Sequence, residues 1–507
     1  MKILFSIVLV NLFLLANAQN TSKPKIEFRG VWVATVVNID WPKKPEDDFA
    51  KKQVDFIEIL DLYKKMNLNA VIVQIRTAGD AFYPSQLVPI SKYLTGKEGQ
   101  NPENNFDFLN WMISQTHVRG MEFHAWLNPY RATFDLNTEI LSPTNNFFTH
   151  QDWMIKYGTK YYYNPGLPEV QNHLVSVIDE IVKNYQIDAI HFDDYFYPYK
   201  IEKEFFNDTL AYKKYGIKNQ KLDDWRRANV DSLMKKVHFA IKKIKPKVQF
   251  GISPFGVWRN KSVDSLGSDS QAGQTNYDDL YADPKVWMKN KWIDYLAPQL
   301  YWSLDNKRAS HRKLINWWNE NCENVNLFIG NGTYKIRLDK DKAWKNKHEI
   351  PNQIELARNV KNVKGNIFFS AISLQNKHKD VVELISNLYS EPALPPSAPN
   401  NDCSKPETPK LKQIYRLEKQ IVFEFENSFS TNFEFVILKK HSSQNDKSDI
   451  KKQVASVYDS NKILSVDEDS LQPDFQYEFT FFNQNAKESE PFSITFDEIT
   501  AQTISKK

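Results

Sequence analysis

The chain has 507 residues, of which 41% are hydrophobic and 25% charged, and this composition excludes an intrinsically disordered protein. Lysine plus arginine (66) nearly balances aspartate plus glutamate (62), so the net charge of +4 favours neither nucleic acid nor a membrane surface as a partner. The 15 glycines form no Walker or dinucleotide-binding motif, and we expect no cofactor. The 14% aromatic content is typical of core packing and of sugar-binding clefts, where sugar faces stack on flat rings.

The first 18 residues have the pattern of a secretory signal peptide. Lys2 supplies the charge, Ile3 to Leu15 form the apolar run, and Ala16-Asn17-Ala18 is a small-x-small cleavage motif. We therefore expect cleavage after Ala18 and an exported protein, periplasmic or extracellular. No later apolar run reaches the roughly 20 residues of a transmembrane segment. No cysteine follows the apolar run, so we do not expect an N-terminal lipid anchor.

Eight apolar runs rich in β-branched and aromatic residues alternate with amphipathic stretches between residues 25 and 390. The predicted strands are Gly30–Val37, Ala70–Arg76, Met121–Asn128, Ile187–Asp193, Val248–Ser253, Ile293–Tyr301, Val325–Asn331 and Asn366–Ser370. The predicted helices are Phe49–Met66, Phe106–Arg119, Glu169–Tyr185, Asp223–Ile244, Asp283–Lys291, Lys313–Glu323, Gln353–Asn362 and His378–Tyr389. Eight consecutive units indicate an α/β fold, the (β/α)8 TIM barrel. The alternative, a doubly wound open sheet, rarely needs eight consecutive parallel units.

Loop lengths predict which end of the barrel is functional. Connections from helix to strand are short, as in Asn67-Leu68-Asn69, whereas those from strand to helix are long after strands two to five. Binding and catalysis in such barrels take place at the carboxyl ends of the strands, and loops this long are usually functional.

Composition shifts after Ser390. Residues 391–410 contain six prolines and predict a stiff linker. Residues 411–500 predict a small all-β sandwich with strands near Gln420–Glu426, Asn432–Lys439, Lys452–Tyr458 and Gln476–Asn483. This region has no clustered histidine, cysteine or acidic residues, which favours a spacer over a second active site. The only cysteines, Cys322 and Cys403, could pair after export or stay separate, and the sequence leaves this open.

Alternation along the strands predicts a polar barrel interior. Side chains at every second position point inward. The predicted inward residues are Gln74, Arg76, Glu122, His124, Trp126, Asn128, His191, Asp193, Gln299 and Tyr301. A barrel interior built only for stability would carry Val, Ile and Leu there. The four strands that deliver these groups therefore predict a functional cavity.

Two adjacent carboxylates end the fourth strand. Asp193 and Asp194 are followed by Tyr195 and Tyr197. An acidic pair on a surface turn is usually only solvated charge, but at a barrel strand end it indicates catalysis. Neighbouring carboxylates repel, and burial pushes one of them toward the protonated form that a general acid needs. We expect His191 to be a structural residue beneath this pair and, with no metal-ligand spacing in the sequence, no metal site.

Six segments resemble, in order, the glycosyl hydrolase-like 10 family, a bacterial group with exported members. They are Glu27–Pro42, Gln74–Pro84, Ala125–Arg131, Ile190–Pro198, Gly251–Asn260 and Pro298–Trp302. The resemblance implies a (β/α)8 barrel and glycoside hydrolysis, and some relatives cut peptidoglycan glycan strands stripped of their stem peptides. The tail resembles the fibronectin type III-like tail of family members. The absence of a lipobox cysteine departs from the many relatives that are lipoproteins.

We therefore expect a polysaccharide substrate and a glycoside hydrolase with Asp193 or Asp194 as its acid. Because adjacent residues hardly flank one bond from opposite faces, the second group is another loop's carboxylate, such as Asp80 or Asp305, or the substrate's own 2-acetamido oxygen. The adjacent pair is similar to that of O-GlcNAcase-type hexosaminidases, in which one aspartate orients the acetamido group and the other protonates.

Several further residues are candidates for substrate binding. They are Arg76, Asp80, Trp126, Asn128, Arg131, Tyr195, Trp258, Gln299, Tyr301 and Trp302. Polar members would bind hydroxyls or the lactyl carboxylate of a muramic unit, and the tryptophans would stack on sugars or belong to the core. The competing function is a non-catalytic glycan-binding envelope protein with a degenerate barrel, which the intact acidic pair disfavours. Glycosidic linkage, anomeric outcome and oligomeric state remain open.

Overall fold

The structure is a computed structural model of the chain. It describes residues 24, 26–375, 378–399, 405, 407–408, 410–417, 419–426, 435–442, 451–456, 463–473, 475–482 and 487–505. The predicted signal peptide and Cys403 lie outside these ranges. Cys322 is half-buried directly after an outer helix.

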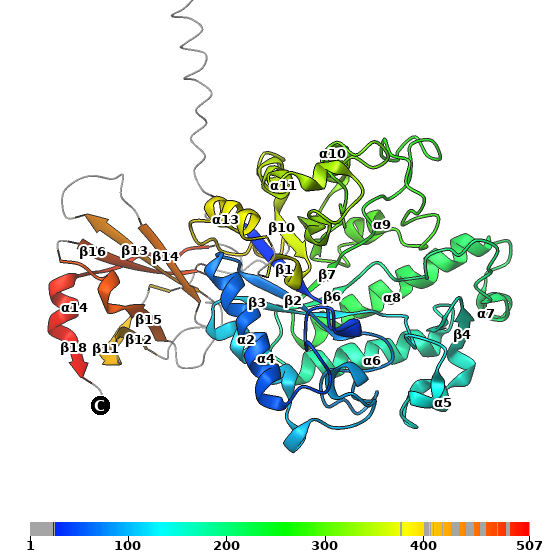
Figure 1. Cartoon of the computed structure of the whole chain (residues 1–507), viewed down its shortest axis with the longest axis horizontal. Helices are drawn as coiled ribbons and strands as arrows, with labels where there is room; N and C mark the ends of the chain where they lie inside the picture. The colour runs from blue at the N-terminus through cyan, green and yellow to red at the C-terminus, as the bar shows by residue number, and fades with distance from the viewer. Residues whose placement is uncertain are drawn as a thin grey trace, which may run out of the picture.

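Eight parallel strands close into a barrel, as predicted (Figure 1). They are β1 (Phe28–Val33), β2 (Ala70–Arg76), β3 (Glu122–Leu127), β6 (Ala189–Phe192), β7 (Gln249–Ile252), β8 (Tyr295–Leu296), β9 (Asn326–Asn331) and β10 (Val363–Phe369). Around the barrel they pair in the order β1-β10-β9-β8-β7-β6-β3-β2. The fold class is therefore the TIM barrel.

Helices cover the outside of the barrel. The main ones are α2 (Phe49–Lys65), α4 (Phe108–Val118), α6 (Pro168–Asn184), α8 (Leu222–Ile244), α9 (Pro284–Lys289), α10 (His311–Asn321), α11 (Glu349–Arg358) and α13 (Lys379–Leu388). Side chains of Asp48, Asp107 and Ser310 accept hydrogen bonds from the first-turn amides of α2, α4 and α10. Such caps satisfy amides that would otherwise lack a partner and fix where these helices begin.

The first and sixth strands are shorter than predicted, each for a local reason. After β1, the carboxylate of Asp40 accepts from the Ala34 amide (2.6 Å) and the amide oxygen of Gln74 accepts from the Val36 amide (3.0 Å). These side chains replace a strand partner, and the chain turns. In the sixth strand, Pro298 has no N–H to donate, so only the isolated bridges of Gln299 continue the pairing beyond β8.

Aromatic side chains fill the barrel interior. The ring of Phe28 stacks on that of Phe328 with centroids 4.0 Å apart, and the centroid of Tyr295 lies 5.2 Å from that of Phe328. Tyr295 fits because the facing residue is Gly251, where a Cβ would lie 1.8 Å from the Tyr295 ring. These rings pack the interior below the strand ends.

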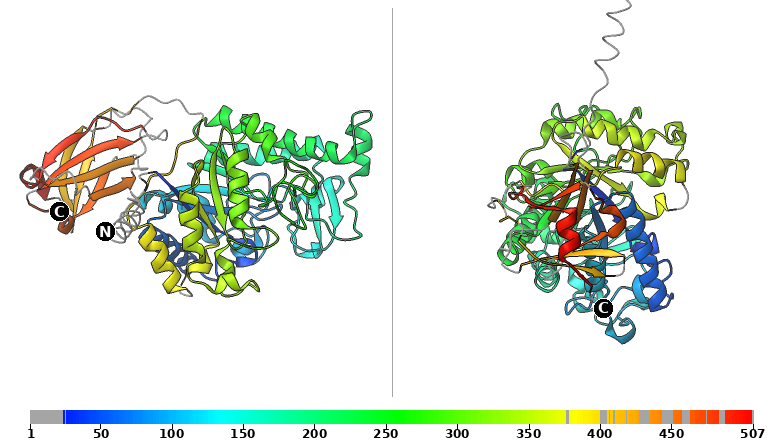
Figure 2. Two further views of the ribbon diagram at one scale, coloured as in Figure 1. Left: turned by 90° about the horizontal axis from the view of Figure 1, so that it is seen from above. Right: turned by 90° about the vertical axis from the view of Figure 1, so that its left-hand side faces the viewer.

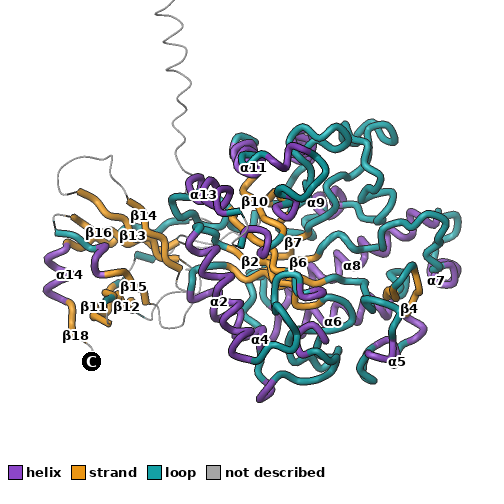
Figure 3. Tube along the Cα trace, viewed as in Figure 1, coloured by secondary structure: helices purple, strands orange, loops and turns teal. Residues whose placement is uncertain are grey.

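The long loops gather at the carboxyl ends of the strands. The connection between β3 and α6 contains α5 (Asn146–Thr149) and the hairpin of β4 (Met154–Tyr157) and β5 (Lys160–Tyr163). The connection between β6 and α8 contains α7 (Thr209–Tyr215). Figures 2 and 3 show these segments at the end of the molecule away from the C-terminal sheets.

The first part of the proline-rich stretch, residues 392–398, lies against the amino ends of the strands. Leu394 is 2% exposed, and its carbonyl accepts from the Glu27 amide at 2.9 Å. The side chain of Asn69 donates to the Ala393 carbonyl (2.9 Å) and that of Asn326 to the Ser397 carbonyl (2.6 Å). This segment therefore packs as part of the barrel.

Two four-stranded sheets follow, in the orders β15-β12-β11-β18 and β14-β13-β16-β17. Their strands are β11 (Leu411–Leu417), β12 (Gln420–Phe425), β13 (Phe435–Ser442), β14 (Lys451–Ser456), β15 (Ile463–Asp467), β16 (Phe475–Phe482), β17 (Phe492–Thr495) and β18 (Thr503–Ser505). Phe423 of one sheet contacts Phe479 of the other with centroids 4.9 Å apart, so the sheets pack face to face.

The C-terminal unit is not purely β, in contrast to the prediction. Helix α14 (Phe496–Gln502) begins at a capping box in which Thr495 and Glu498 exchange hydrogen bonds. Strand β18 then pairs parallel to β11. The likeness of this unit to fibronectin type III domains stays a prediction. In the part of the chain that the structure describes, no helix is long and apolar enough to cross a membrane.

Candidate active site

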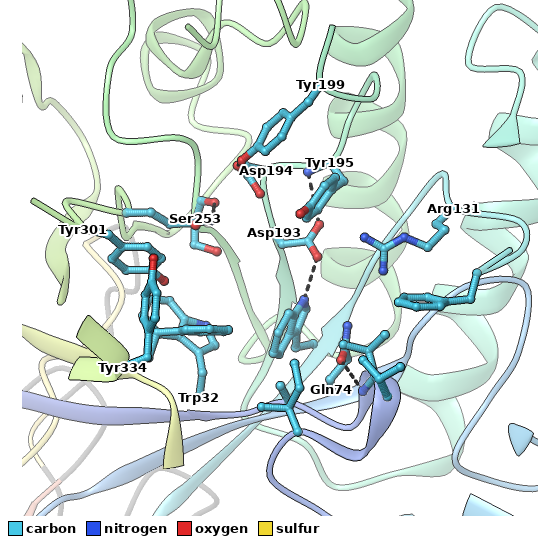
Figure 4. A pocket seen from close by; sticks show the side chains of 18 residues that line it. Trp32, Gln74, Arg131, Asp193, Asp194, Tyr195, Tyr199, Ser253, Tyr301 and Tyr334 are labelled. Atoms are coloured by element: carbon cyan, nitrogen blue, oxygen red, sulfur yellow. Dashed lines mark hydrogen bonds between the residues drawn. The ribbon is translucent and has the colours of Figure 1, made fainter. Parts of the chain in front are cut away.

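A cavity of about 370 Å³ opens at the carboxyl ends of the barrel strands (Figure 4). Strand ends contribute Trp32, Gln74, Trp126, Asp193, Ser253, Gln299, Tyr301 and Phe369 to its lining. Loops contribute the apolar Val36, Val37, Ile39 and Phe134, and also Arg131, Tyr195, Tyr199 and Tyr334. Asp193 and Asp194 are the two carboxylates among the lining residues.

Asp193 is held by three donors. Its Oδ2 accepts from the indole N–H of Trp126 and the side-chain amide of Asn128, both at 3.1 Å, and its Oδ1 accepts from the Tyr195 amide at 3.3 Å. Burial raises the pKa of Asp193 above its usual range, and the charge of Arg131 together with these hydrogen bonds partly opposes this rise. The donors therefore fix the carboxylate in one orientation and favour its ionised form.

Asp194 has a different environment. Its carboxylate accepts a short hydrogen bond from the hydroxyl of Tyr199, and the side chain of Gln299 is a second donor to it. Burial, and next the adjacent charge of Asp193, raise the pKa of Asp194 to about 7. Two neighbouring carboxylates whose environments separate their proton affinities are the arrangement in which one acts as an acid and the other stays charged. The pKa of Asp194, close to neutral pH, is the one of the pair that suits a general acid.

Arg131 and the tyrosines form opposite walls of the cavity. The guanidinium of Arg131 lies 4.7 Å from the Tyr195 ring centroid and donates to the Thr77 carbonyl at 3.2 Å. Figure 4 shows it on one side of Asp193, with Tyr301 and Tyr334 across the cavity. The cavity thus combines a cationic wall with an aromatic wall.

The floor of the cavity rests on a buried hydrogen-bonded chain. The indole N–H of Trp32 donates to Nε2 of His191 (3.2 Å), so the proton of this ring is on Nδ1, 2.9 Å from the hydroxyl of Tyr295. The same hydroxyl lies 2.8 Å from Nδ1 of His124, whose Nε2 lies 3.0 Å from the carboxylate of Glu122. Burial lowers the pKa of both histidines, to about 4 for His124. His191 is therefore neutral, and it orients Trp32 by accepting the hydrogen bond of the indole N–H. It lies beneath the acidic pair as a structural residue, as predicted.

Five predicted binding residues do not line this cavity, and four of them have other places in the fold. Arg76 is buried near the Tyr163 ring, and Asn128 acts through Asp193. Asp80 accepts from the Thr77 and Ala78 amides (3.0 and 2.9 Å) and so shapes its own loop. Trp258 stacks on the Trp317 ring, 5.7 Å away, and donates to Asp283.

Two other predicted residues lie in neighbouring depressions. Trp302 lines a smaller cavity that adjoins the first. Asp305, the other candidate for a second carboxylate, is exposed, pairs with Arg312 at 3.1 Å and lines a separate polar cleft. Neither Asp80 nor Asp305 therefore faces the Asp193–Asp194 pair from across the cavity.

Sequence reasoning missed several lining residues. Trp32 follows the inward alternation of β1 and could have been found from it. Tyr199 could not be distinguished from Tyr197, which instead packs beside Arg226, because alternation ends where the strand ends. Tyr334 lies in the turn after β9 and Phe369 at the end of β10, and neither has a local sequence signal. Among the described residues, no three His, Cys, Asp or Glu side chains are grouped so as to hold a metal ion.

Comparison with known proteins gives a consistent result. The model of the family described as glycosyl hydrolase-like 10 matches residues 27–346. Glycosyl hydrolase YngK of Bacillus subtilis is 46% identical over 407 residues, covering 79% of this chain and 78% of that protein. Glycosyl hydrolase DigH of Escherichia coli K12 is 36% identical over 379 residues, covering 70% and 84%. Among solved structures, the PgaB (BpsB) glycoside hydrolase domain from Bordetella bronchiseptica has a TM-score of 0.49 at 12% identity, covering 71% of this chain and 99% of that one. The family model and the two relatives show that the chain belongs to the glycosyl hydrolase-like 10 family and is a glycoside hydrolase.

Proposed function

We propose that this protein is exported by residues 1–18 and cleaves N-acetylated glycan strands of the peptidoglycan type. Asp194 is the general acid, and Asp193 orients and stabilises the 2-acetamido group of the sugar whose bond is cut. The supporting observation is that the two lining carboxylates are adjacent in sequence and differ in their hydrogen-bond partners.

The placement of the carboxylates favours help from the substrate. A retaining enzyme with its own nucleophile holds two carboxyl groups about 5–5.5 Å apart on either side of the bond, and an inverting enzyme holds them farther apart. Neither arrangement suits two consecutive residues at one strand end. Asp80 and Asp305, which could have supplied the opposite carboxylate, are engaged elsewhere. The acetamido oxygen of the substrate then takes the nucleophile's place.

The proposed reaction proceeds in two steps. Asp194 donates its proton to the glycosidic oxygen while the acetamido oxygen attacks the anomeric carbon, and the bond to the leaving sugar breaks. Asp193 accepts the acetamido N–H and stabilises the resulting cyclic oxazolinium ion. In the second step, ionised Asp194 takes a proton from water, the hydroxide adds to the anomeric carbon, and the oxazolinium ring opens with net retention.

The positive charge in the cavity wall favours a glycan substrate that carries a carboxylate. Arg131 lines the cavity beside Asp193, and in the described part of the chain no ion pair within 4 Å engages its guanidinium. A muramic unit whose stem peptide has been removed carries a free lactyl carboxylate, which a guanidinium binds with two parallel hydrogen bonds. The resemblance to glycan-strand hydrolases points to the same substrate.

The test is a reducing-end assay on purified peptide-free peptidoglycan strands with the mature protein. We expect new reducing ends with the wild type and roughly 100-fold fewer with Asp194→Asn, as for loss of a positioned acid. Asp305→Asn, on an exposed carboxylate, is the matched control and should keep full activity. A folded wild type that releases no reducing ends would refute the proposal.

A further inference from the structure

A second cavity, of about 200 Å³, adjoins the catalytic cavity. The two share Tyr199, Gln299, Tyr301 and Tyr334. The second cavity adds Phe255, Trp302 and Lys335 to this lining. Because four lining residues are common to both, the two cavities form one continuous cleft with room beyond the sugar that reacts.

The added wall is aromatic and rigidly oriented. The rings of Phe255 and Trp302 meet edge to face, with centroids 5.6 Å apart at 82°, and Phe255 meets Tyr199 in the same way at 6.2 Å and 83°. Phe255 and Trp302 are only partly buried, and Tyr334 is 42% exposed. Edge-to-face packing holds each ring in place while leaving ring surface open to the cavity. Such surface suits the apolar face of a sugar.

We propose that this second cavity, defined by Phe255, Trp302 and Tyr334, is the leaving-group subsite, which binds the sugar on the far side of the bond that is cut. This inference rests on the proposed function. An enzyme with such a subsite acts on a chain of sugars and uses contacts on both sides of the scissile bond.

The position of the general acid indicates on which side of the scissile bond the second cavity lies. The leaving oxygen must lie next to the general acid that protonates it. Asp194 bonds to Tyr199, a residue common to both cavities, whereas Asp193 is held from the side of Trp126 and Asn128. Figure 4 shows Tyr199 beside Asp194, and Arg131 on the other side of Asp193. The leaving sugar therefore extends from Asp194 toward the second cavity, and the acetamido group of the reacting sugar lies toward Asp193.

The second cavity selects by stacking and not by charge. Its one cationic side chain, Lys335, pairs with Asp339 at 3.0 Å. With that charge already compensated, an anionic substituent gains little there. The occupant is therefore the neutral face of a pyranose ring, in contrast to the Arg131 wall of the first cavity.

The test compares two substrates that differ only in the leaving group. Peptide-free glycan strands carry a sugar in the leaving position, whereas a 2-acetamido-2-deoxy-β-glycosyl fluoride releases fluoride and leaves the second cavity empty. We expect Trp302→Ala and Phe255→Ala each to lower kcat/KM on strands about tenfold or more. On the fluoride both should stay within about twofold of the wild type. Trp302→Phe, which keeps a ring, should recover most of the activity on strands.

Phe239→Ala is the matched control, because this aromatic side chain is 56% exposed on the outer helix α8 and should affect neither substrate. Equal losses on strands and fluoride would show a structural role for the rings and overturn the subsite. Unchanged activity on strands would overturn it as well. A wild type that cleaves the fluoride but gains nothing from a sugar leaving group overturns the subsite alone, whereas a wild type inactive on both substrates overturns the proposed function.

Discussion

Replacing Asp194 by asparagine should stabilise the barrel, and more so as the pH rises. In the folded protein, burial and the charge of Asp193 raise the pKa of Asp194 from 3.8 to about 7. Between these values the unfolded chain has lost a proton that the folded protein still binds. The free energy of unfolding therefore falls as the pH rises through this window, and the cost remains above about pH 7.

The size of this free-energy cost follows from the pKa shift of Asp194. Three pKa units at 1.36 kcal/mol each correspond to about 4 kcal/mol at pH 8. The neutral asparagine avoids this cost, and the pKa of about 7 already includes the lowering effect of the Tyr199 hydrogen bond. We thus expect Asp194→Asn to be more stable than the wild type by about 4 kcal/mol at pH 8 and nearly equal to it at pH 4.

Urea unfolding followed by tryptophan fluorescence measures this difference. All 13 tryptophans lie between residues 32 and 344, so the signal reports the barrel and not the C-terminal sheets. Asp305→Asn, at an exposed carboxylate, should match the wild type at every pH. If the stability gain of Asp194→Asn is the same at pH 4 and pH 8, Asp194 does not hold its proton through this range, and its role as the acid is refuted.

Three further predictions concern the pH profile, the floor and the domain boundary. The kcat/KM of the wild type should fall above about pH 7 as Asp194 ionises, and Tyr199→Phe, which removes a donor to the ionised form, should move this fall to higher pH in a pH-rate profile. Tyr295→Phe should lower the free energy of unfolding in urea by about 1–3 kcal/mol, because His191 and His124 lose their shared hydrogen-bond partner. An unchanged unfolding midpoint would contradict the buried network of hydrogen bonds beneath the cavity. A protein ending at Pro399 should unfold at the midpoint of the full chain, whereas one ending at Tyr389 loses the buried Leu394 and should be less stable by about 2–4 kcal/mol; equal midpoints would show that residues 392–398 are only a spacer.

The barrel could be predicted because its signals are local and repeated. Parallel strands buried on both faces appear in the sequence as continuous apolar runs, and for this reason the predicted bounds of β2 and β9 agree with the observed bounds to within a residue. The ends of strands were harder to predict, because they depend on side chains from elsewhere. β1 stops where Asp40 and Gln74 supply its hydrogen-bond acceptors, and no pattern within residues 30–37 contains that information.

Strand geometry predicts part of the site, because alternation fixes the direction of a side chain, and the loop residues Arg131 and Tyr195 were candidates for another reason, since each lies in a segment that resembles the family. Alternation places Trp126 and Asp193 inward, and both line the cavity. It has no power within loops, which is why Trp258 was expected in the site but packs on Trp317. Asp80 lies outside the cavity lining for a different reason: its carboxylate accepts hydrogen bonds from the amides two and three residues earlier, a local turn that a Thr-x-x-Asp spacing indicates.

The most direct test of the central claim, that the substrate's 2-acetamido group acts as the nucleophile beside Asp193, is to remove that acetyl group. Peptide-free glycan strands are chemically N-deacetylated, a portion is re-acetylated, and all three samples are incubated with the mature protein and examined by mass spectrometry. We predict cleavage of the native and re-acetylated strands and none of the deacetylated strands. Equal cleavage of all three would show that the nucleophile comes from the protein or from water, and would contradict the mechanism.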